Sequence, residues 1–371
     1  MSANGQTIIQ LLEQWTPKYY AVPDDKIGLQ LGTLNKKIDN VMVTLDVTEQ
    51  VVDEAIENDV GLIIAHHPII FRPLKHIRTD FSAGRIYEKC IKHDIAVYIA
   101  HTNLDVAEGG INDMMANALG LKDLSPLEEV HTEKLNKLVV FVPEEAHNNV
   151  LKSIFAAGAG WIGDYSHCSF NIKGEGTFLP HVDTDPYIGE QGKLTKVNEI
   201  RIETIVPQSI QRKVIQAMLK AHPYEEVAYD LYPMDLKGKS FGLGRVGRLP
   251  RIKTLEELSE LVKLNYDVTM VKTVGILNKP IHKVAVLGGS GSRYVQQAKY
   301  AGADVLITGD IDFHTAQDAL ADGMSIIDPG HHAEKIMIKH VAGYLQKEFD
   351  SKNIGTNVLE SNINTDPFTF L

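Results

Sequence analysis

Short apolar strands alternate with amphipathic helices at both ends of this chain, and the strands run directly into polar side chains. Three strands are expected in the first part: VMVTLDV (41–47), VGLIIAHHP (60–68) and DIAVYIAHTNLD (94–105). Three more are expected near the end: IHKVAVLGGSGS (281–292), ADVLITGDIDFH (303–314) and MSIIDPGHH (324–332). Strands that alternate with helices predict a parallel sheet covered by helices. We therefore expect an α/β core built from two segments of the chain.

The middle of the chain has a different pattern. Residues 129–232 contain two consecutive β–α–β units, which are typical of a ferredoxin-like α+β domain. The flanking stretches, Leu127–Thr132 and Pro233–Lys239, are rich in proline or charge, as linkers are. We predict that residues 1–128 and 233–371 form the core α/β domain and that residues 129–232 form an inserted domain.

Composition excludes several classes of protein. The 371 residues carry 48 acidic and 37 basic side chains, a formal net charge of −11. This charge argues against a nucleic-acid binder, because phosphate contacts need a basic surface. The two cysteines, Cys90 and Cys168, are too few for a disulfide framework or a thiolate metal cage. Because the sequence also lacks a signal peptide and a membrane span, it predicts a cytoplasmic protein.

Imidazole and carboxylate side chains gather where the predicted strands end. His66 and His67 follow one strand, and Asp105 follows the next. His331 and Glu334 lie three residues apart at the start of a helix expected near Pro329, so they face the same way. The carboxyl ends of parallel strands meet at one edge of a sheet and bind ligands there. We predict a metal site that consists of His66, His67, Asp105, His331 and Glu334.

Each part of this site also has a simpler interpretation. A His-His-Pro sequence can be a turn, Asp105 can be the N-cap of a helix, and Glu334 can favour a first helical turn. Taken together, the five residues favour a site. Imidazoles and carboxylates without a thiolate suit Zn, Fe or Mn, and five ligands exceed the four of a tetrahedral zinc. We expect two divalent transition-metal ions per chain, with zinc favoured, and a metal-activated water as a hydrolytic nucleophile.

Other residues at predicted strand ends leave two interpretations open. His101 and His314 can orient a ligand or act as general acid or base, or they can simply bond to the backbone. The GGSGS sequence (288–292) can hold a phosphate on backbone N–H groups or form a tight turn. Arg245 and Arg248 are candidates to contact an anionic ligand.

The combined motifs resemble the NIF-three-like dinuclear-metal proteins, often labelled GTP cyclohydrolase I type 2 homologues. The resemblance rests on LDVTEQVVDEA, IIAHHPIIF, HTNLD, GLGRVGRLP, TGDIDFH and DPGHHAEK, in that order. It implies that the five predicted ligands hold two metals inside a toroidal homohexamer, and that the insertion is of the PII/CutA type. One departure is PDDKIGL, which stands where the family often has Trp-Asp-Asn and puts a role for Asp25 in doubt.

Two functions are compatible with these features. The first is a metal-dependent hydrolase that attacks a nucleotide-like substrate with metal-bound hydroxide. The usual enzyme that opens the ring of GTP has a Cys/His zinc site, which is absent from this sequence, so we treat the GTP cyclohydrolase label as an inherited family name. The alternative is a non-catalytic regulatory or metal-handling ring protein whose inserted domain senses a small ligand.

Overall fold

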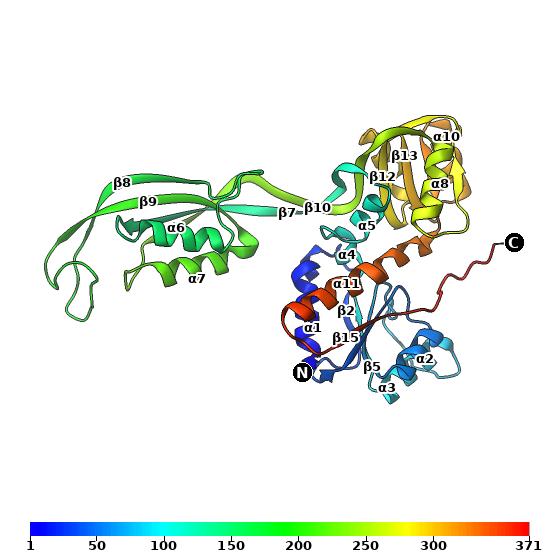
Figure 1. Cartoon of the computed structure of the whole chain (residues 1–371), viewed down its shortest axis with the longest axis horizontal. Helices are drawn as coiled ribbons and strands as arrows, with labels where there is room; N and C mark the ends of the chain where they lie inside the picture. Colours follow the sequence, from blue (N-terminus) through cyan, green and yellow to red (C-terminus); the bar gives the residue numbers. More distant parts are fainter. Residues whose placement is uncertain (371) are drawn as a thin grey trace. The chain divides into compact units, whose positions relative to one another are not determined.

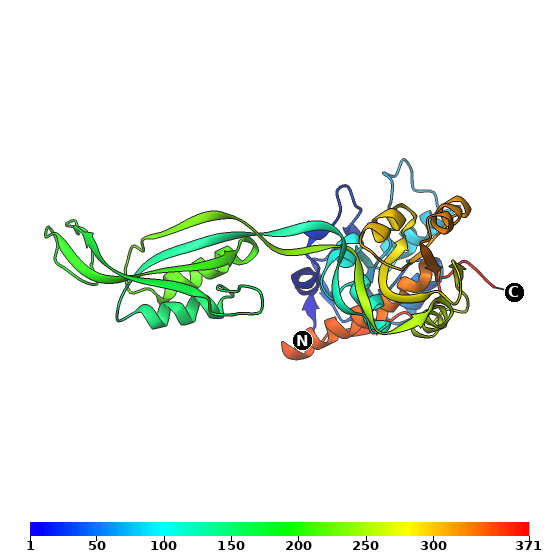
Figure 2. The same ribbon diagram turned by 90° about the horizontal axis from the view of Figure 1, so that it is seen from above.

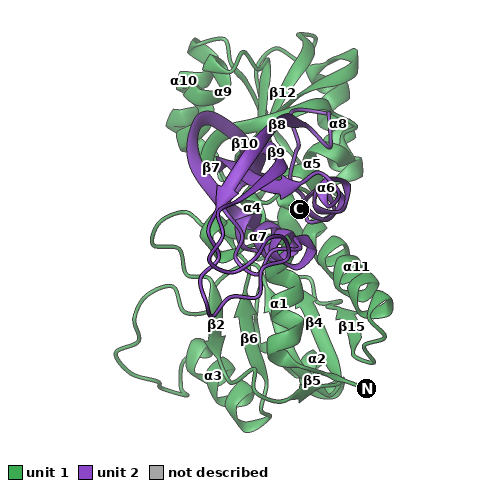
Figure 3. Ribbon diagram, turned by 90° about the vertical axis from the view of Figure 1, so that its left-hand side faces the viewer, with its two compact units in different colours: residues 1–131, 241–371 green, residues 132–240 purple. Residues whose placement is uncertain are grey.

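The computed structural model describes residues 1–370, which form two compact units (Figure 3). Unit 1 comprises residues 1–131 and the chain from residue 241 onward, and unit 2 comprises residues 132–240. The predicted insertion, residues 129–232, differs slightly from unit 2, and its autonomous folding stays a prediction. Within the described residues, no helix combines the length and the apolar content needed to cross a bilayer.

The first sheet of unit 1 has five strands in the order β15-β4-β5-β6-β2. Their bounds are β2 (Gly28–Leu31), β4 (Asn40–Thr44), β5 (Val60–Ala65), β6 (Ala96–Ile99) and β15 (Asn357–Glu360). Strands β15, β4, β5 and β6 run parallel, and β2 is antiparallel at the edge. The parallel strands are connected through α2 (Glu49–Glu57) and α3 (Ser82–Lys92). Strand β5 is an uninterrupted apolar run, as expected of a parallel strand that is buried on both faces.

The second sheet of unit 1 contains the strands from the end of the chain, in the order β11-β14-β13-β12-β10. Their bounds are β10 (Tyr229–Thr254), β11 (Lys272–Val274), β12 (Pro280–Ser290), β13 (Val305–Gly309) and β14 (Ser325–Asp328). Strands β12, β13 and β14 are parallel, whereas β10 and β11 are antiparallel to their neighbours. Helices α8 (Leu255–Asn265), α9 (Val295–Tyr300) and α10 (Phe313–Ala321) belong to this part of the chain.

The two sheets of unit 1 are joined by helices that share one hydrophobic core. Helix α11 (Ile336–Ser351) contacts β4, α1 (Gly5–Trp15) and α5 (Ile111–Ala118), and Figure 1 shows it between the sheets. The short strands β1 (Ala3–Asn4) and β3 (Lys37–Ile38) pair with each other beside α1. The predicted α/β class is confirmed, but the core strands form two sheets with parallel and antiparallel pairs rather than one parallel sheet. The error has a physical reason, because local hydrophobic patterning marks strands without revealing which strands pair.

Unit 2 has the element order β–α–β–β–α–β. It uses the end of β7 (Lys122–Pro143), α6 (His147–Ala156), β8 (Ser169–Phe178), β9 (Thr195–Pro207), α7 (Gln211–Ala221) and the start of β10. The strand order is β10-β7-β9-β8, with β9 antiparallel to both β7 and β8. Helices α6 and α7 contact each other and cover one face of the sheet (Figures 1 and 2). Buried residues such as Val140, Ile154 and Val214 give this unit its own core.

Candidate metal centre

The predicted ligands come from strand ends of both sheets of unit 1. His66 and His67 directly follow β5, and Asp105 lies in the short helix α4 (Thr102–Val106) that begins after β6. His331 and Glu334 lie in a 3-10 helix, His331–Lys335, that follows β14. The structure brings all five residues together, although the edge of a single sheet was expected. The carboxyl ends of two sheets supply the ligands instead.

One side of the cluster consists of His67, His331 and one oxygen of Glu334. His67 Nε2 lies 3.2 Å from Glu334 Oε2 and 3.2 Å from His331 Nε2, and His331 Nε2 lies 3.3 Å from Glu334 Oε2. Tetrahedral zinc with bonds of about 2.0 Å separates its ligand atoms by about 3.3 Å. These three atoms therefore have the spacing of one face of a tetrahedral metal site.

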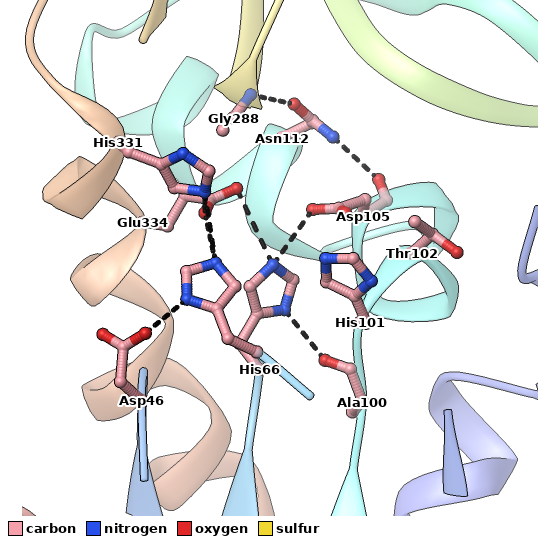
Figure 4. Close-up of polar contacts among 12 residues, drawn as sticks. Asp46, His66, Ala100, His101, Thr102, Asp105, Asn112, Gly288, His331 and Glu334 are labelled. Carbon is pink, nitrogen blue, oxygen red and sulfur yellow. Dashed lines mark hydrogen bonds and ion pairs between the residues drawn. The ribbon is translucent and has the colours of Figure 1, made fainter. Parts of the chain in front are cut away.

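The other side consists of His66, Asp105 and the second oxygen of Glu334. His66 Nε2 lies 3.7 Å from Glu334 Oε1 and 3.9 Å from Asp105 Oδ1. All three residues are buried, and Asp105 Oδ1 has no hydrogen-bond partner. An unpaired buried carboxylate oxygen is costly unless a cation contacts it. The residues therefore fit a metal ion on this side too, and Glu334, with one oxygen on each side, has the geometry of a bridging ligand (Figure 4).

Each imidazole of the centre is oriented through its Nδ1 atom. His66 donates its Nδ1–H to Ala100 O at 2.8 Å, and His67 donates to Asp46 Oδ1 at 2.7 Å. His101 donates to Asp25 Oδ1 at 2.8 Å, and His331 donates to Asp310 Oδ2 at 2.7 Å. Metal-binding histidines characteristically donate the other ring N–H to a carboxylate or a carbonyl in this way. The arrangement directs the Nε2 atoms of His66, His67 and His331 toward the Glu334 carboxylate.

The structure places His101 among the candidate metal ligands, although the sequence suggested an orienting or acid–base role. Ring nitrogens of His66, His67 and His101 lie within 4.8 Å of one another. The doubt about Asp25 is also resolved, because Asp25 accepts hydrogen bonds from His101 and from the backbone N–H and hydroxyl of Thr102. The HTNLD sequence could have indicated that His101 lies near Asp105, because the two residues are four apart around the start of a helix.

Comparisons with known proteins identify the family of this chain. The sequence matches the family described as Duf34/NIF3 (NGG1p interacting factor 3) over residues 3–367. This chain belongs to the Duf34/NIF3 family. Proteins named GTP cyclohydrolase 1 type 2 homolog from Halalkalibacterium halodurans and Bacillus subtilis are each 55% identical to it, over 100% of this chain and 99% of theirs. The resemblance inferred from the sequence motifs is thus confirmed.

Solved structures show the same fold. A Bacillus cereus protein related to NIF3 has a TM-score of 0.94 and 51% sequence identity, and the match covers 100% of both chains. A Staphylococcus aureus protein has a TM-score of 0.76 and 30% identity, over 100% of this chain and 99% of that chain. The fold of this chain is therefore shared with a solved protein related to NIF3.

The family motif DPGHHAEK adopts a tighter helix than expected. We predicted an α-helix from about Pro329, but His331–Lys335 is a 3-10 helix, and α11 begins at Ile336. A 3-10 helix has three residues per turn, so side chains at i and i+3 are aligned. His331 and Glu334 consequently point to the same place, whereas His332 is in none of the metal-binding groups found within residues 1–370.

His314 lies outside the centre. It is exposed on α10, its ring packs edge-on against Phe313, and its backbone N–H donates to Asp312. Among the described residues, it is in none of the groups that could hold a metal. The structure thus places His101 at the candidate centre but gives His314 no contact with it.

The glycine-rich turn after β12 packs against Glu334. A Cβ atom on Gly288 would lie 2.7 Å from Glu334 Oε1, and one on Gly289 would lie 3.2 Å from the same oxygen. The turn therefore needs glycine because the backbone approaches the carboxylate closely, which favours the turn interpretation over a phosphate cradle. Arg245, another candidate for anion binding, is buried and bonds to Asp113 and to backbone carbonyls instead. Arg248 is exposed.

The cluster holds protons strongly when no metal is bound. Burial lowers the pKa of His67, but hydrogen bonds with Asp46 and Glu334 outweigh it and raise this pKa to about 10. The hydrogen bond with Glu334 raises the pKa of His331 to about 9. Although burial opposes ionisation, the surrounding imidazoles keep the pKa of Glu334 well below its usual value. A metal ion bound by this cluster would therefore have to replace protons.

A cleft of about 1100 Å³ opens beside the centre. His67, His101 and His331 are among its lining residues, so candidate ligands are accessible from it. The exposed side chains of Phe71 and Phe368 contribute apolar walls. The cleft has the mixed lining of a small-molecule site, with a few polar groups set among apolar ones.

Proposed function

We propose that this Duf34/NIF3 protein is a metal-dependent hydrolase with two divalent metal ions per chain. His67, His331 and Glu334 would hold one ion, and the second would be held by His66, His101, Asp105 and the other oxygen of Glu334. The observation that carries the proposal is the position of Glu334, which is 3% exposed and directs its two oxygens to different sets of ligands. Zinc fits best, because the ligands are imidazoles and carboxylates and the spacing is tetrahedral on one side.

The protein's own groups have distinct tasks in such a reaction. Asp46, Asp25 and Asp310 hold three imidazoles in one tautomer and orientation, which keeps their Nε2 atoms toward the ions. The apolar walls of the cleft would bind the substrate and limit access of bulk water. The ions, when bound, would acidify a water molecule and make it a hydrolytic nucleophile at neutral pH. A nucleotide-like substrate is proposed from the name that the relatives carry.

The test combines metal content with turnover. Replacing both His66 and His67 by Ala should abolish binding of two ions per chain, because each position loses an imidazole, while circular dichroism stays unchanged. His314→Ala is the matched control, since that exposed histidine does not contact the cluster. The wild-type protein loaded with metal should hydrolyse a member of a nucleotide panel, and the double variant should not. Unchanged metal content in the double variant would contradict the site itself.

A second candidate function is a non-catalytic regulatory or metal-handling protein. Every metal-binding group found within residues 1–370 lies in unit 1. Unit 2 therefore has no part in the metal centre and needs a separate role, which favours this second function. We propose that unit 2 is a ferredoxin-like domain of the PII/CutA type that senses a small ligand. Its β–α–β–β–α–β order, its strand order and its separate core support this. Tight metabolite binding together with persistent inactivity of metal-loaded protein would favour this function over hydrolysis.

Two further experiments address the organisation of the protein. Unit 2 produced alone should melt cooperatively, because it contains its own core. We also propose the toroidal homohexamer that the family resemblance implies, and light scattering on the full chain should give six times the chain mass. A monomer or dimer at micromolar concentration would contradict the hexamer.

A further inference from the structure

The end of the chain is directed toward the metal centre. Strand β15 pairs in parallel with β4, and the chain continues along it, because the backbone N–H of Ser361 donates to Val43 O at 3.0 Å. The Ser361 hydroxyl and the Asn362 backbone N–H both donate to the carboxylate of Glu54. Strand β4 leads to the segment that contains Asp46. The terminal segment, residues 361–370, is therefore anchored beside the centre.

Thr365 contacts the carboxylate that orients His67. Its hydroxyl donates to Asp46 Oδ2 at 2.6 Å, while Asp46 Oδ1 accepts the Nδ1–H of His67 at 2.7 Å. The two oxygens of Asp46 are thus used by different partners. Because the Asp46 side chain remains 32% exposed, it needs a second bond to fix the plane of its carboxylate.

The same three-part arrangement occurs at His101. There the Thr102 hydroxyl donates to Asp25 Oδ2, and Asp25 Oδ1 accepts the Nδ1–H of His101. In that case the threonine is the neighbour of the histidine in sequence. At His67 the threonine comes from the other end of the chain. The repetition within one centre indicates that a hydroxyl, a carboxylate and an imidazole act together to position a ligand.

We propose that Thr365 is a positioning residue for the metal centre and acts through Asp46 on His67. This inference rests on the proposed metal-binding function. With Thr365 in place, the Asp46 carboxylate holds the His67 ring so that Nε2 faces His331 and Glu334. Without the hydroxyl, the carboxylate can rotate, and only the metal position that uses His67 is affected. The position at His66 and Asp105 does not depend on this bond.

The test is Thr365→Val, which keeps the side-chain shape and removes the donor. Removing a partner of a metal ligand typically costs roughly 10- to 100-fold in affinity, and Thr365 acts one bond further out, so we expect a loss of roughly 3- to 10-fold. Calorimetric titration with Co²⁺ should show weaker binding at one position and unchanged binding at the other. The absorption spectrum of the weakened position should shift, because the geometry of one imidazole changes.

Two variants make the result specific. Thr365→Ser keeps the hydroxyl and should restore wild-type binding, whereas Thr369→Val makes the same change at an exposed threonine and should leave Co²⁺ affinity unchanged. Equal affinity of Thr365→Val and wild type at both positions would overturn the inference. Equal weakening at both positions would overturn it too, because it would mean a general structural effect.

Failure of the inference can be told apart from failure of the proposed function. If wild-type protein binds fewer than two Co²⁺ ions per chain, the dinuclear centre itself is wrong. If Thr365→Val does not fold, deletion of residues 365–371 provides a second variant. That variant lacks the donor and should show the same selective loss at one position, and wild-type affinity at both positions would refute the role of Thr365.

Discussion

The replacement Glu334→Gln tests the centre most directly. It preserves the shape of the side chain and removes the charge that faces both metal positions. The group of His67, His331 and Glu334 loses its one carboxylate, and the group of His66, Asp105 and Glu334 loses one of two. Even outer partners of metal ligands contribute roughly 10- to 100-fold to affinity, so loss of a direct ligand should cost at least roughly 100-fold, or about 2.7 kcal/mol, per ion. The expected result is fewer than one bound ion per chain after dialysis against dilute metal.

Elemental analysis of the dialysed protein gives the stoichiometry, and thermal melting in chelator shows whether the metal-free variant is folded. The matched control is His332→Ala, which removes the adjacent imidazole and leaves every metal-binding group of the described chain intact. The refuting result would be two bound ions per chain in Glu334→Gln together with loss of metal in His332→Ala. It would mean that the 3-10 helix does not present Glu334 as a ligand.

Three further predictions concern protons, close packing and a buried ion pair. At pH 8 the raised pKa of His67, about 10, leaves the imidazole protonated in metal-free protein, so metal binding should release at least one proton. Calorimetry in buffers of different ionisation enthalpy counts the released protons. No release would contradict the assignment of His67 as a ligand. Because this pKa exceeds the unfolded value, the stability it confers is complete below about pH 6.5 and is lost toward pH 10. Gly288→Ala should lower metal content because its Cβ would meet a carboxylate oxygen at 2.7 Å, whereas Gly343→Ala, with nothing within 4 Å, should not. Arg245→Ala should destabilise the fold by roughly 3–5 kcal/mol in denaturant melts, because it leaves Asp113 buried without its partner.

The structure brings together the five residues that the sequence predicted as ligands, and the signals that selected them are local. His66 and His67 directly follow an apolar strand, and the spacing of His331 and Glu334 places them on one face of a helix whether it is α or 3-10. The orienting carboxylates were not predicted. Asp46 and Asp310 are separated from their histidines by 21 residues each, and nothing in the local pattern relates them.

The sheet arrangement was missed for a similar reason. Strand β5 and strand β13 have the same buried, apolar pattern, although they belong to different sheets. Pairing depends on contacts between distant segments, which hydrophobic periodicity does not encode. His101 is an intermediate case, because its spacing from Asp105 was visible but a strand was expected to continue through it.

The distances in sequence across the centre affect when it can form in a cell. His67 and Glu334 are 267 residues apart, and Asp46 and Thr365 are 319 apart. At a synthesis rate of roughly 5–20 residues per second, the ribosome adds Glu334 about 13–53 seconds after His67. We expect unit 2, whose sequence lies between them, to fold during that interval. During that interval a nascent chain contains His66, His67, His101 and Asp105 but not His331 or Glu334, so the proposed dinuclear centre could be filled only after the later residues are made.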